Sequence, residues 1–219
     1  MTYPYSRYSY ADDRDKLIEA LCEGKRVLHI GACDSPYTEI KLQQDLLLHS
    51  ALDGVASELR GVDIDEQSIE YLRARGIDNI ECVDIAEYDS SGFDIESIVF
   101  GETIEHLENP GEFLRHLKKH MSDRTELIIS TPNCYSLFFQ SMVLRGQENI
   151  HPDHVIGFSA ALLSQLLESI GFQIRSLHFT FLPRDRENLK KKIWKVLAKM
   201  RNGWAETLVV RAVKDGESI

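Results

Sequence analysis

The feature that most constrains the fold is a short apolar run that ends in a glycine. Residues 25–34 read Lys-Arg-Val-Leu-His-Ile-Gly-Ala-Cys-Asp, a strand-length stretch followed by a turn at Gly31. Residues 60–65 form a second short run, and this one ends in carboxylates. In doubly wound sheets, a turn after the first strand and an acid after the second hold the ribose of a nucleoside. The pattern predicts a parallel sheet with a nucleoside-containing cofactor.

Segments with strand and helix patterns alternate along the chain. The predicted strands cover residues 26–30, 59–63, 79–83, 95–100, 126–130, 173–181 and 207–213. Predicted helices between them begin at the capping residues Asp65, Asn109 and Ser159. Such alternation is typical of a mostly parallel sheet covered on both faces. We therefore expect an α/β, doubly wound, Rossmann-like fold with a seven-stranded, mostly parallel sheet whose last strand is antiparallel.

Length and composition favour one domain over residues 1–219, because 43% of the residues are hydrophobic and 27% are charged. The tyrosine-rich residues 1–12 show no clear helical or strand periodicity, and they are expected to form an N-terminal arm. No apolar run approaches the ~20 residues that span a bilayer. The four cysteines follow neither a metal-binding nor a disulfide spacing. We expect a cytoplasmic location.

The formal charge of −10 makes nucleic acid an unfavoured partner, because surfaces that grip phosphates are broadly basic. Residues 184–203 differ from the rest and read as a basic amphipathic helix between the last two strands. Eight of the residues from 184 to 201 are Lys or Arg. This helix is either a solvated element packed on the domain edge or a contact for a partner, an oligomer, an anionic membrane or an anionic substrate.

The turn after the first strand also limits the kind of cofactor. Residues 31–36 read Gly-Ala-Cys-Asp-Ser-Pro and lack the second and third glycines that bring backbone against a pyrophosphate. This disfavours a nicotinamide or flavin dinucleotide. A cofactor without phosphates, such as S-adenosylmethionine, needs only one tight turn and polar groups for its ribose and amino-acid ends.

Two later motifs are the most specific part of the sequence. Residues 105–110 read Glu-His-Leu-Glu-Asn-Pro after the fourth predicted strand, and residues 130–133 read Ser-Thr-Pro-Asn after the fifth. His-Pro-Asp-His-Val follows at residues 151–155. With these motifs, residues 25–182 resemble the class I S-adenosylmethionine-dependent methyltransferases. The resemblance implies a methyltransferase with S-adenosylmethionine as its cofactor.

The resemblance also implies a set of cofactor contacts. Gly31 and its neighbours are expected under the methionine part, Asp63 at the ribose hydroxyls, and Asp84 with Ile85 at the adenine. His29 stands where the family usually has an acid. The complete predicted set is His29, Gly31, Ala32, Asp34, Asp63, Ile64, Asp84, Ile85 and Gly101.

Methyl transfer to oxygen requires a group that removes the acceptor's proton, and histidine titrates close to neutral pH. The predicted catalytic residues are Glu105, His106, His151 and His154, with Glu105 able to orient an imidazole. The alternative is structural, because a histidine after a strand can simply cap a helix or satisfy a loop carbonyl.

A metal site is a further, less favoured alternative. If the segment is helical, Glu102, Glu105 and His106 share one face, and His154 completes a set of oxygen and nitrogen ligands. This set resembles that of the small-RNA 2′-O-methyltransferases, whereas the metal-free branch also carries Glu-His-Leu and a later histidine. A divalent metal is therefore possible but is not part of the favoured prediction.

Three functions remain open at this stage. The favoured one is O-methylation of a small hydroxylated metabolite or sugar. The others are metal-assisted 2′-O-methylation of RNA ends and a catalytically inactive methyltransferase-fold binding subunit. Tyr135, Phe138 and Phe139 either wall the acceptor pocket or belong to the core.

Overall fold

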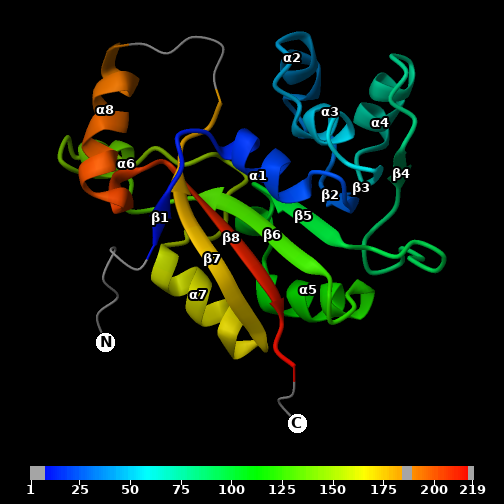
Figure 1. Ribbon diagram of the computed structural model, residues 1–219. Helices are drawn as coiled ribbons and strands as arrows, with labels where there is room; N and C mark the ends of the chain where they lie inside the picture. Colours follow the sequence, from blue (N-terminus) through cyan, green and yellow to red (C-terminus); the bar gives the residue numbers. More distant parts are fainter. Residues whose placement is uncertain (1–7, 184–188, 217–219) are drawn as a thin grey trace.

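The computed structural model describes residues 8–183 and 189–216, which form one twisted sheet with helices around it (Figure 1). Within these residues the sheet has eight strands, in the order β1-β7-β8-β6-β5-β2-β3-β4. The strands are β1 (Ser9–Tyr10), β2 (Arg26–Ile30), β3 (Glu58–Asp63), β4 (Ile80–Cys82), β5 (Ser97–Gly101), β6 (Glu126–Pro132), β7 (Phe172–Thr180) and β8 (Thr207–Lys214).

The predicted mostly parallel sheet is confirmed. β2 pairs in parallel with β3 and β5, and β5 pairs in parallel with β6. β8 is antiparallel, as expected, and it lies between β6 and β7. The sheet has one strand more than the seven predicted, because part of the expected N-terminal arm pairs with β7 through Ser9 and Tyr10.

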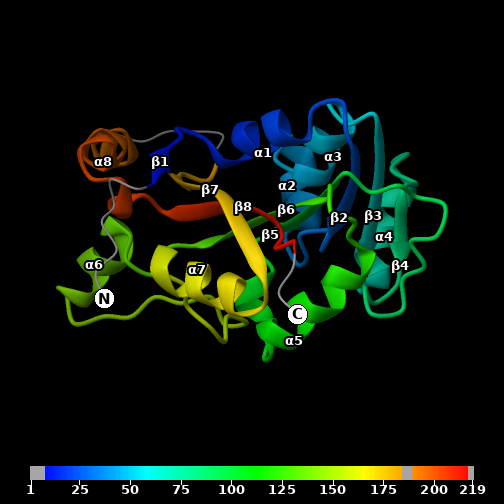
Figure 2. The ribbon, with the colours of Figure 1, turned by 60° about the horizontal axis from the view of Figure 1, so that its bottom comes forward.

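Helices cover both faces of the sheet, with α1 and α3 on one side and α5 and α7 on the other (Figure 2). The helices are α1 (Arg14–Cys22), α2 (Thr38–Gln43), α3 (Leu48–Asp53), α4 (Glu66–Arg73), α5 (Pro110–Leu117), α6 (Leu137–Val143), α7 (Ala160–Ser169) and α8 (Leu189–Met200). Asp65, Asn109 and Ser159 each accept a hydrogen bond from a first-turn backbone N–H, so the predicted N-caps are confirmed.

Successive core residues of each strand pack on opposite faces of the sheet. Val27 packs with α1 and α3, whereas its neighbour Leu28 packs in the larger cluster with α5 and α7. Val99 and Ile98 on β5 divide in the same way. Because successive side chains point to opposite faces, the strands are buried on both sides and read as continuous apolar runs.

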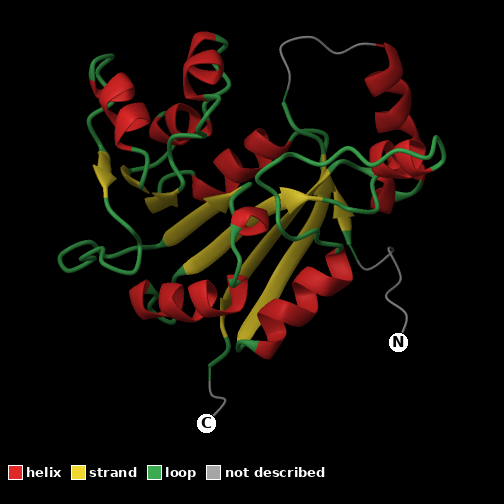
Figure 3. Ribbon diagram, turned by 180° about the vertical axis from the view of Figure 1, so that it is seen from behind, coloured by secondary structure: helices red, strands yellow, loops and turns green. Residues whose placement is uncertain are grey.

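The predicted basic helix is present as α8, followed by a short 3₁₀ turn at Asn202–Trp204, while residues 184–188 lie outside the described part. Seen from behind, α8 and α6 lie at the same end of the molecule (Figure 3), where the rings of Phe138 and Trp194 are 6.1 Å apart. The Lys199 ammonium lies 3.1 Å from Asp12. In the described ranges, no helix combines the length and hydrophobicity needed to cross a bilayer.

Candidate active site

A cavity of about 480 Å³ opens at the carboxyl ends of β2, β3 and β5. The chain leaves β2 toward β3 on one side and returns to β5 on the other, so the cavity lies at the switch point where doubly wound sheets bind ligands. Gly31, Asp34, Asp63 and Gly101 line it, which places four of the predicted cofactor residues around one space.

Gly31 cannot be replaced by a larger residue without displacement of its surroundings. Its φ is +69°, and a Cβ atom there would lie 2.7 Å from the Thr103 Oγ1 atom. That hydroxyl donates a hydrogen bond to the Gly101 carbonyl at 2.8 Å. The close contact between the loops after β2 and β5 therefore requires glycine, and it leaves backbone exposed to the cavity.

Asp63 presents a fixed carboxylate at the end of β3. The backbone N–H of Cys33 donates to its Oδ2 atom at 2.9 Å, and the N–H of Asp65 donates to its Oδ1 atom at 3.0 Å. Each oxygen retains a second lone pair. The carboxylate can therefore accept hydrogen bonds from a ribose diol without any rearrangement of the loops.

Two cationic side chains in the cavity wall were not predicted from the sequence, because no motif marks them. Arg14 on α1 is 3% exposed, and its guanidinium lies 2.5 Å from Asp15 and 3.5 Å from Glu102. Lys41 on α2 lies 2.5 Å from Asp34. Burial raises the pKa of Glu102, and the Arg14 charge opposes that effect. The mixed charges suit a zwitterionic amino-acid group.

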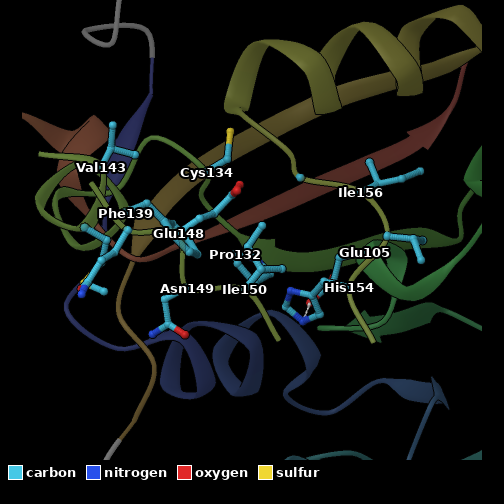
Figure 4. Close-up of a pocket in the computed structure, with 14 residues that line it drawn as sticks. Glu105, Pro132, Cys134, Phe139, Val143, Glu148, Asn149, Ile150, His154 and Ile156 are labelled. Atoms are coloured by element: carbon cyan, nitrogen blue, oxygen red, sulfur yellow. Dashed lines mark ion pairs between the residues drawn. The ribbon is translucent and has the colours of Figure 1, made fainter. Parts of the chain in front are cut away.

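Glu105 carries a carboxyl oxygen without a hydrogen-bond partner among the described residues. The side chain is almost fully buried, its Oε2 atom accepts a hydrogen bond from the Thr131 hydroxyl at 2.9 Å, and Oε1 is unpaired. His154 Nε2 lies 3.9 Å from this Oε1 atom (Figure 4). Burial, with the nearby Glu102 carboxylate, raises the pKa of Glu105 to about 8.

The three predicted histidines lie together in the same cavity. One ring nitrogen from each of His106, His151 and His154 lies within 4.8 Å of the others. His106 Nδ1 donates to the Asp153 carbonyl at 3.1 Å, which leaves its other nitrogen with a free lone pair. Burial and the two neighbouring rings lower the pKa of His154.

The helical face assumed for the alternative metal site does not form. Only Ile104–His106 is helical, as a single 3₁₀ turn, and Glu102 precedes it with φ of +49°. Glu102 faces Arg14 instead of the histidines. Among the described residues, the group close enough to hold one metal ion is His106, His151 and His154, and neither Glu102 nor Glu105 belongs to it.

A second cavity of about 210 Å³ adjoins the first, and Glu105, Pro132 and His154 line both. Its outer wall comes from α6 and from residues 147–150 and 154–157. Figure 4 shows Phe139 and Val143 at one end of it and the Glu105–His154 pair at the other. Of the aromatic residues considered for an acceptor pocket, Phe139 lines this cavity, while Phe138 packs against Trp194.

The remaining predicted cofactor residues lie outside the lining of the large cavity. His29 is buried against His49, with the two rings stacked at 5.4 Å, and Ala32 and Ile85 are buried in core clusters. Ile64 is 76% exposed. Asp84 is also exposed and accepts a hydrogen bond from the Ala86 N–H at 2.9 Å. Their contacts with a cofactor stay predictions.

Comparison with known proteins defines the class. A family model described as a methyltransferase domain matches residues 5–177, so the chain belongs to that family. Its fold is that of a class I S-adenosylmethionine-dependent methyltransferase. S-adenosylmethionine fits the residues present, since the Gly31 backbone, the Asp63 carboxylate and the cations supply the expected partners.

One curated relative is a probable S-adenosylmethionine-dependent methyltransferase of Mycolicibacterium smegmatis. It is 28% identical over 156 residues, which are 70% of this chain and 54% of the relative. The chain therefore spans about half the length of the curated relative that it matches.

Solved structures share the fold at low sequence identity. An S-adenosylmethionine-dependent methyltransferase of Archaeoglobus fulgidus is 20% identical with a TM-score of 0.55, over 92% of this chain and 95% of that one. The small RNA methyltransferase HEN1 is 18% identical with a TM-score of 0.59, over 94% and 25%. A chain of the Haloferax volcanii complex that contains the Trm112 methyltransferase activator is 14% identical with a TM-score of 0.62, over 93% and 89%.

Proposed function

We propose that the protein transfers the methyl group of S-adenosylmethionine to a hydroxyl oxygen of a small acceptor. The observation that carries the proposal is the unpaired Oε1 atom of Glu105 beside His154, at the boundary between the two cavities. A buried carboxyl oxygen without a partner costs free energy unless a ligand supplies one. The acceptor hydroxyl is the group that reaches this position from the smaller cavity.

The larger cavity holds the cofactor in this proposal. Asp63 accepts hydrogen bonds from the ribose hydroxyls, and its own hydrogen bonds to two backbone N–H groups keep it in place. Arg14 and Lys41 attract the methionine carboxylate, while Asp34 and Glu102 attract the amino group. These contacts orient the cofactor, which is the main catalytic requirement for an activated methyl donor.

S-adenosylmethionine would supply a methyl group bound to a sulfonium sulfur. A lone pair of the acceptor oxygen forms the new O–C bond as the S–C bond breaks, and the electrons of the S–C bond stay on sulfur. The hydroxyl group of the acceptor loses its proton in this step. His154 accepts that proton, because its imidazole lies at the boundary of the two cavities. Glu105 lies 3.9 Å from the imidazole, across the space that the acceptor hydroxyl enters, and its Oε1 atom helps to position that hydroxyl. His106 and His151 pack edge-on or tilted against the His154 ring and fix its position.

An acceptor screen that detects S-adenosylhomocysteine tests the proposal. Phenols, alcohols and sugars are incubated with the protein and S-adenosylmethionine, and His154→Ala is run in parallel. Turnover with a hydroxylated acceptor, strongly reduced in the variant, supports the proposal. Binding of S-adenosylmethionine without turnover of any acceptor favours the alternative of an inactive binding subunit.

The histidine cluster favours one second candidate, a metal-assisted 2′-O-methyltransferase for RNA ends. The three imidazole nitrogens lie within 4.8 Å of one another, a spacing that suits one divalent ion such as Co²⁺, Mn²⁺ or Zn²⁺. Titration with Co²⁺, followed by its visible absorption bands, tests this candidate in wild type and in His151→Ala. Turnover of an RNA 3′ end that requires the added metal supports it, whereas turnover that resists chelation contradicts it.

A further inference from the structure

We propose that the acceptor is a neutral hydroxylated compound with an apolar body of about one ring, seated in the 210 Å³ cavity. This inference rests on the proposed function and narrows its substrate class. It disfavours the sugar that the sequence left open, and it also disfavours an RNA end.

The wall of the smaller cavity is mostly apolar. Phe139, Met142 and Val143 of α6 form one side, and Ile150 with Ile156 extends it toward His154 (Figure 4). Apolar walls favour an apolar ligand by roughly 25 cal/mol per Å² of surface removed from water. A sugar placed here would lose water from several hydroxyl groups and find few partners in exchange.

The polar groups of this cavity are few and lie at defined places. Glu105 and His154 stand where the cavity meets the cofactor cavity, while the polar side chains of residues 147–149 belong to the exposed loop. The arrangement matches a ligand with one hydroxyl at one end. The rest of the ligand contacts carbon and sulfur atoms of the wall.

The size of the cavity sets the size of the apolar body. An apolar cavity of about 150 Å³ is known to hold benzene. A cavity of about 210 Å³ therefore accommodates one aromatic or alicyclic ring with a short substituent. A nucleotide base with its ribose and phosphate exceeds this space, so most of such a ligand would lie outside the apolar wall.

The charged side chains of the cavity wall also indicate that the acceptor is neutral. Among the described lining residues there is no Lys or Arg, whereas Glu148 contributes an exposed carboxylate. A phosphate or carboxylate on the acceptor would meet no cation in this wall. The acceptor is therefore neutral at the end that enters the cavity.

Two variants at the C-terminal end of α6, one in the helix and one at its C-cap, form a matched pair for the test. Met142 lines the cavity and is half-buried, whereas Leu144 is 88% exposed and lies outside the lining. Met142→Glu and Leu144→Glu add the same charge two residues apart. Thermal melting establishes that both variants fold, and calorimetry with S-adenosylmethionine establishes that the cofactor site is intact.

The probes are 4-propylphenol, glucose and an RNA oligonucleotide, with S-adenosylhomocysteine formation as the readout. We expect turnover of 4-propylphenol, a fall in kcat/KM of about tenfold or more in Met142→Glu, and no change in Leu144→Glu. Turnover of glucose or RNA in place of 4-propylphenol overturns this inference and leaves methyl transfer standing. Absence of S-adenosylmethionine binding overturns the proposed function itself.

Discussion

His154 Nε2 lies 3.9 Å from the Oε1 atom of Glu105, which is buried and without a hydrogen-bond partner in the described part of the chain. The distance is too long for a hydrogen bond and short enough for both groups to contact one acceptor oxygen. The two residues come from different segments, since Glu105 belongs to the turn after β5 and His154 to the loop before α7. We infer that the gap between them is the place of the reacting hydroxyl.

Removal of either group should slow catalysis without weakening cofactor binding. A positioned acid–base group contributes about 10²- to 10⁴-fold to rate, so His154→Ala should lower kcat by about a hundredfold or more. Glu105→Gln should have a smaller effect in the same direction, because the amide retains the shape. Steady-state kinetics measures kcat, and calorimetry measures the affinity for S-adenosylmethionine.

His116→Ala is the control for this prediction, because His116 lies on α5 and lines neither cavity. It should retain wild-type kcat. Equal turnover in His154→Ala and His116→Ala would show that His154 is not a catalytic residue.

Gly31 and Gly24 offer a comparison that separates steric crowding from backbone strain. Both have φ of +69°, but an added Cβ meets Thr103 at 2.7 Å only at Gly31. Gly24→Ala should cost about 1 kcal/mol of unfolding free energy through strain alone. Gly31→Ala should cost about 1–3 kcal/mol more, because the loop after β5 must also move. Urea unfolding without ligand measures both, and equal losses would contradict the crowding at Gly31.

The buried pair His29 and His49 should make the fold sensitive to acid. Their Nδ1 atoms are 3.1 Å apart, and burial lowers the pKa of both rings. The charges of His49, Arg14 and Lys41 lower the pKa of His29 further, whereas Asn79 and Asp53 oppose the effect at His49. Because unfolded histidine binds a proton near pH 6.5, stability from this pair is present above that pH and is lost as pH falls toward the lowered pKa.

The measurement is urea unfolding of wild type and of the double variant His29→Leu, His49→Leu at pH 7.5 and pH 5.5. Glu105 acts in the opposite direction, since its pKa is raised to about 8, so the comparison uses the difference between the two proteins. The double variant should lose less stability on acidification than wild type. A loss equal to that of wild type would exclude the pair as an acid-sensitive element.

Much of the fold could be predicted because the buried strands are short apolar runs bounded by turns and caps. β1 could not, since two residues carry no periodicity and Ser9 and Tyr10 become a strand only through pairing with β7 far along the chain. The position of β8 between β6 and β7 likewise depends on tertiary pairing, whereas its antiparallel direction was expected because the basic helix and Gly203 separate the last two predicted strands.

The candidate site was predictable where a motif marks it. Glu105 and His106 follow a strand, and they line the large cavity together with His151 and His154. Arg14 was missed because α1 precedes every motif, and only the fold brings it to Glu102. His29 lies on the face of β2 that α3 covers, so its neighbour is His49 instead of the cavity, and sequence alone does not reveal that covering helix.

The most direct test of the account is calorimetric titration of the protein with S-adenosylmethionine, in wild type, Asp63→Asn and Asp78→Asn. Asp78 is exposed and lies outside the large cavity, so its variant should bind like wild type. We predict one bound cofactor per chain and an affinity about tenfold or more lower in Asp63→Asn, because hydrogen bonds to a charged acceptor are lost. No binding to wild type, or equal affinity in both variants, would contradict the account.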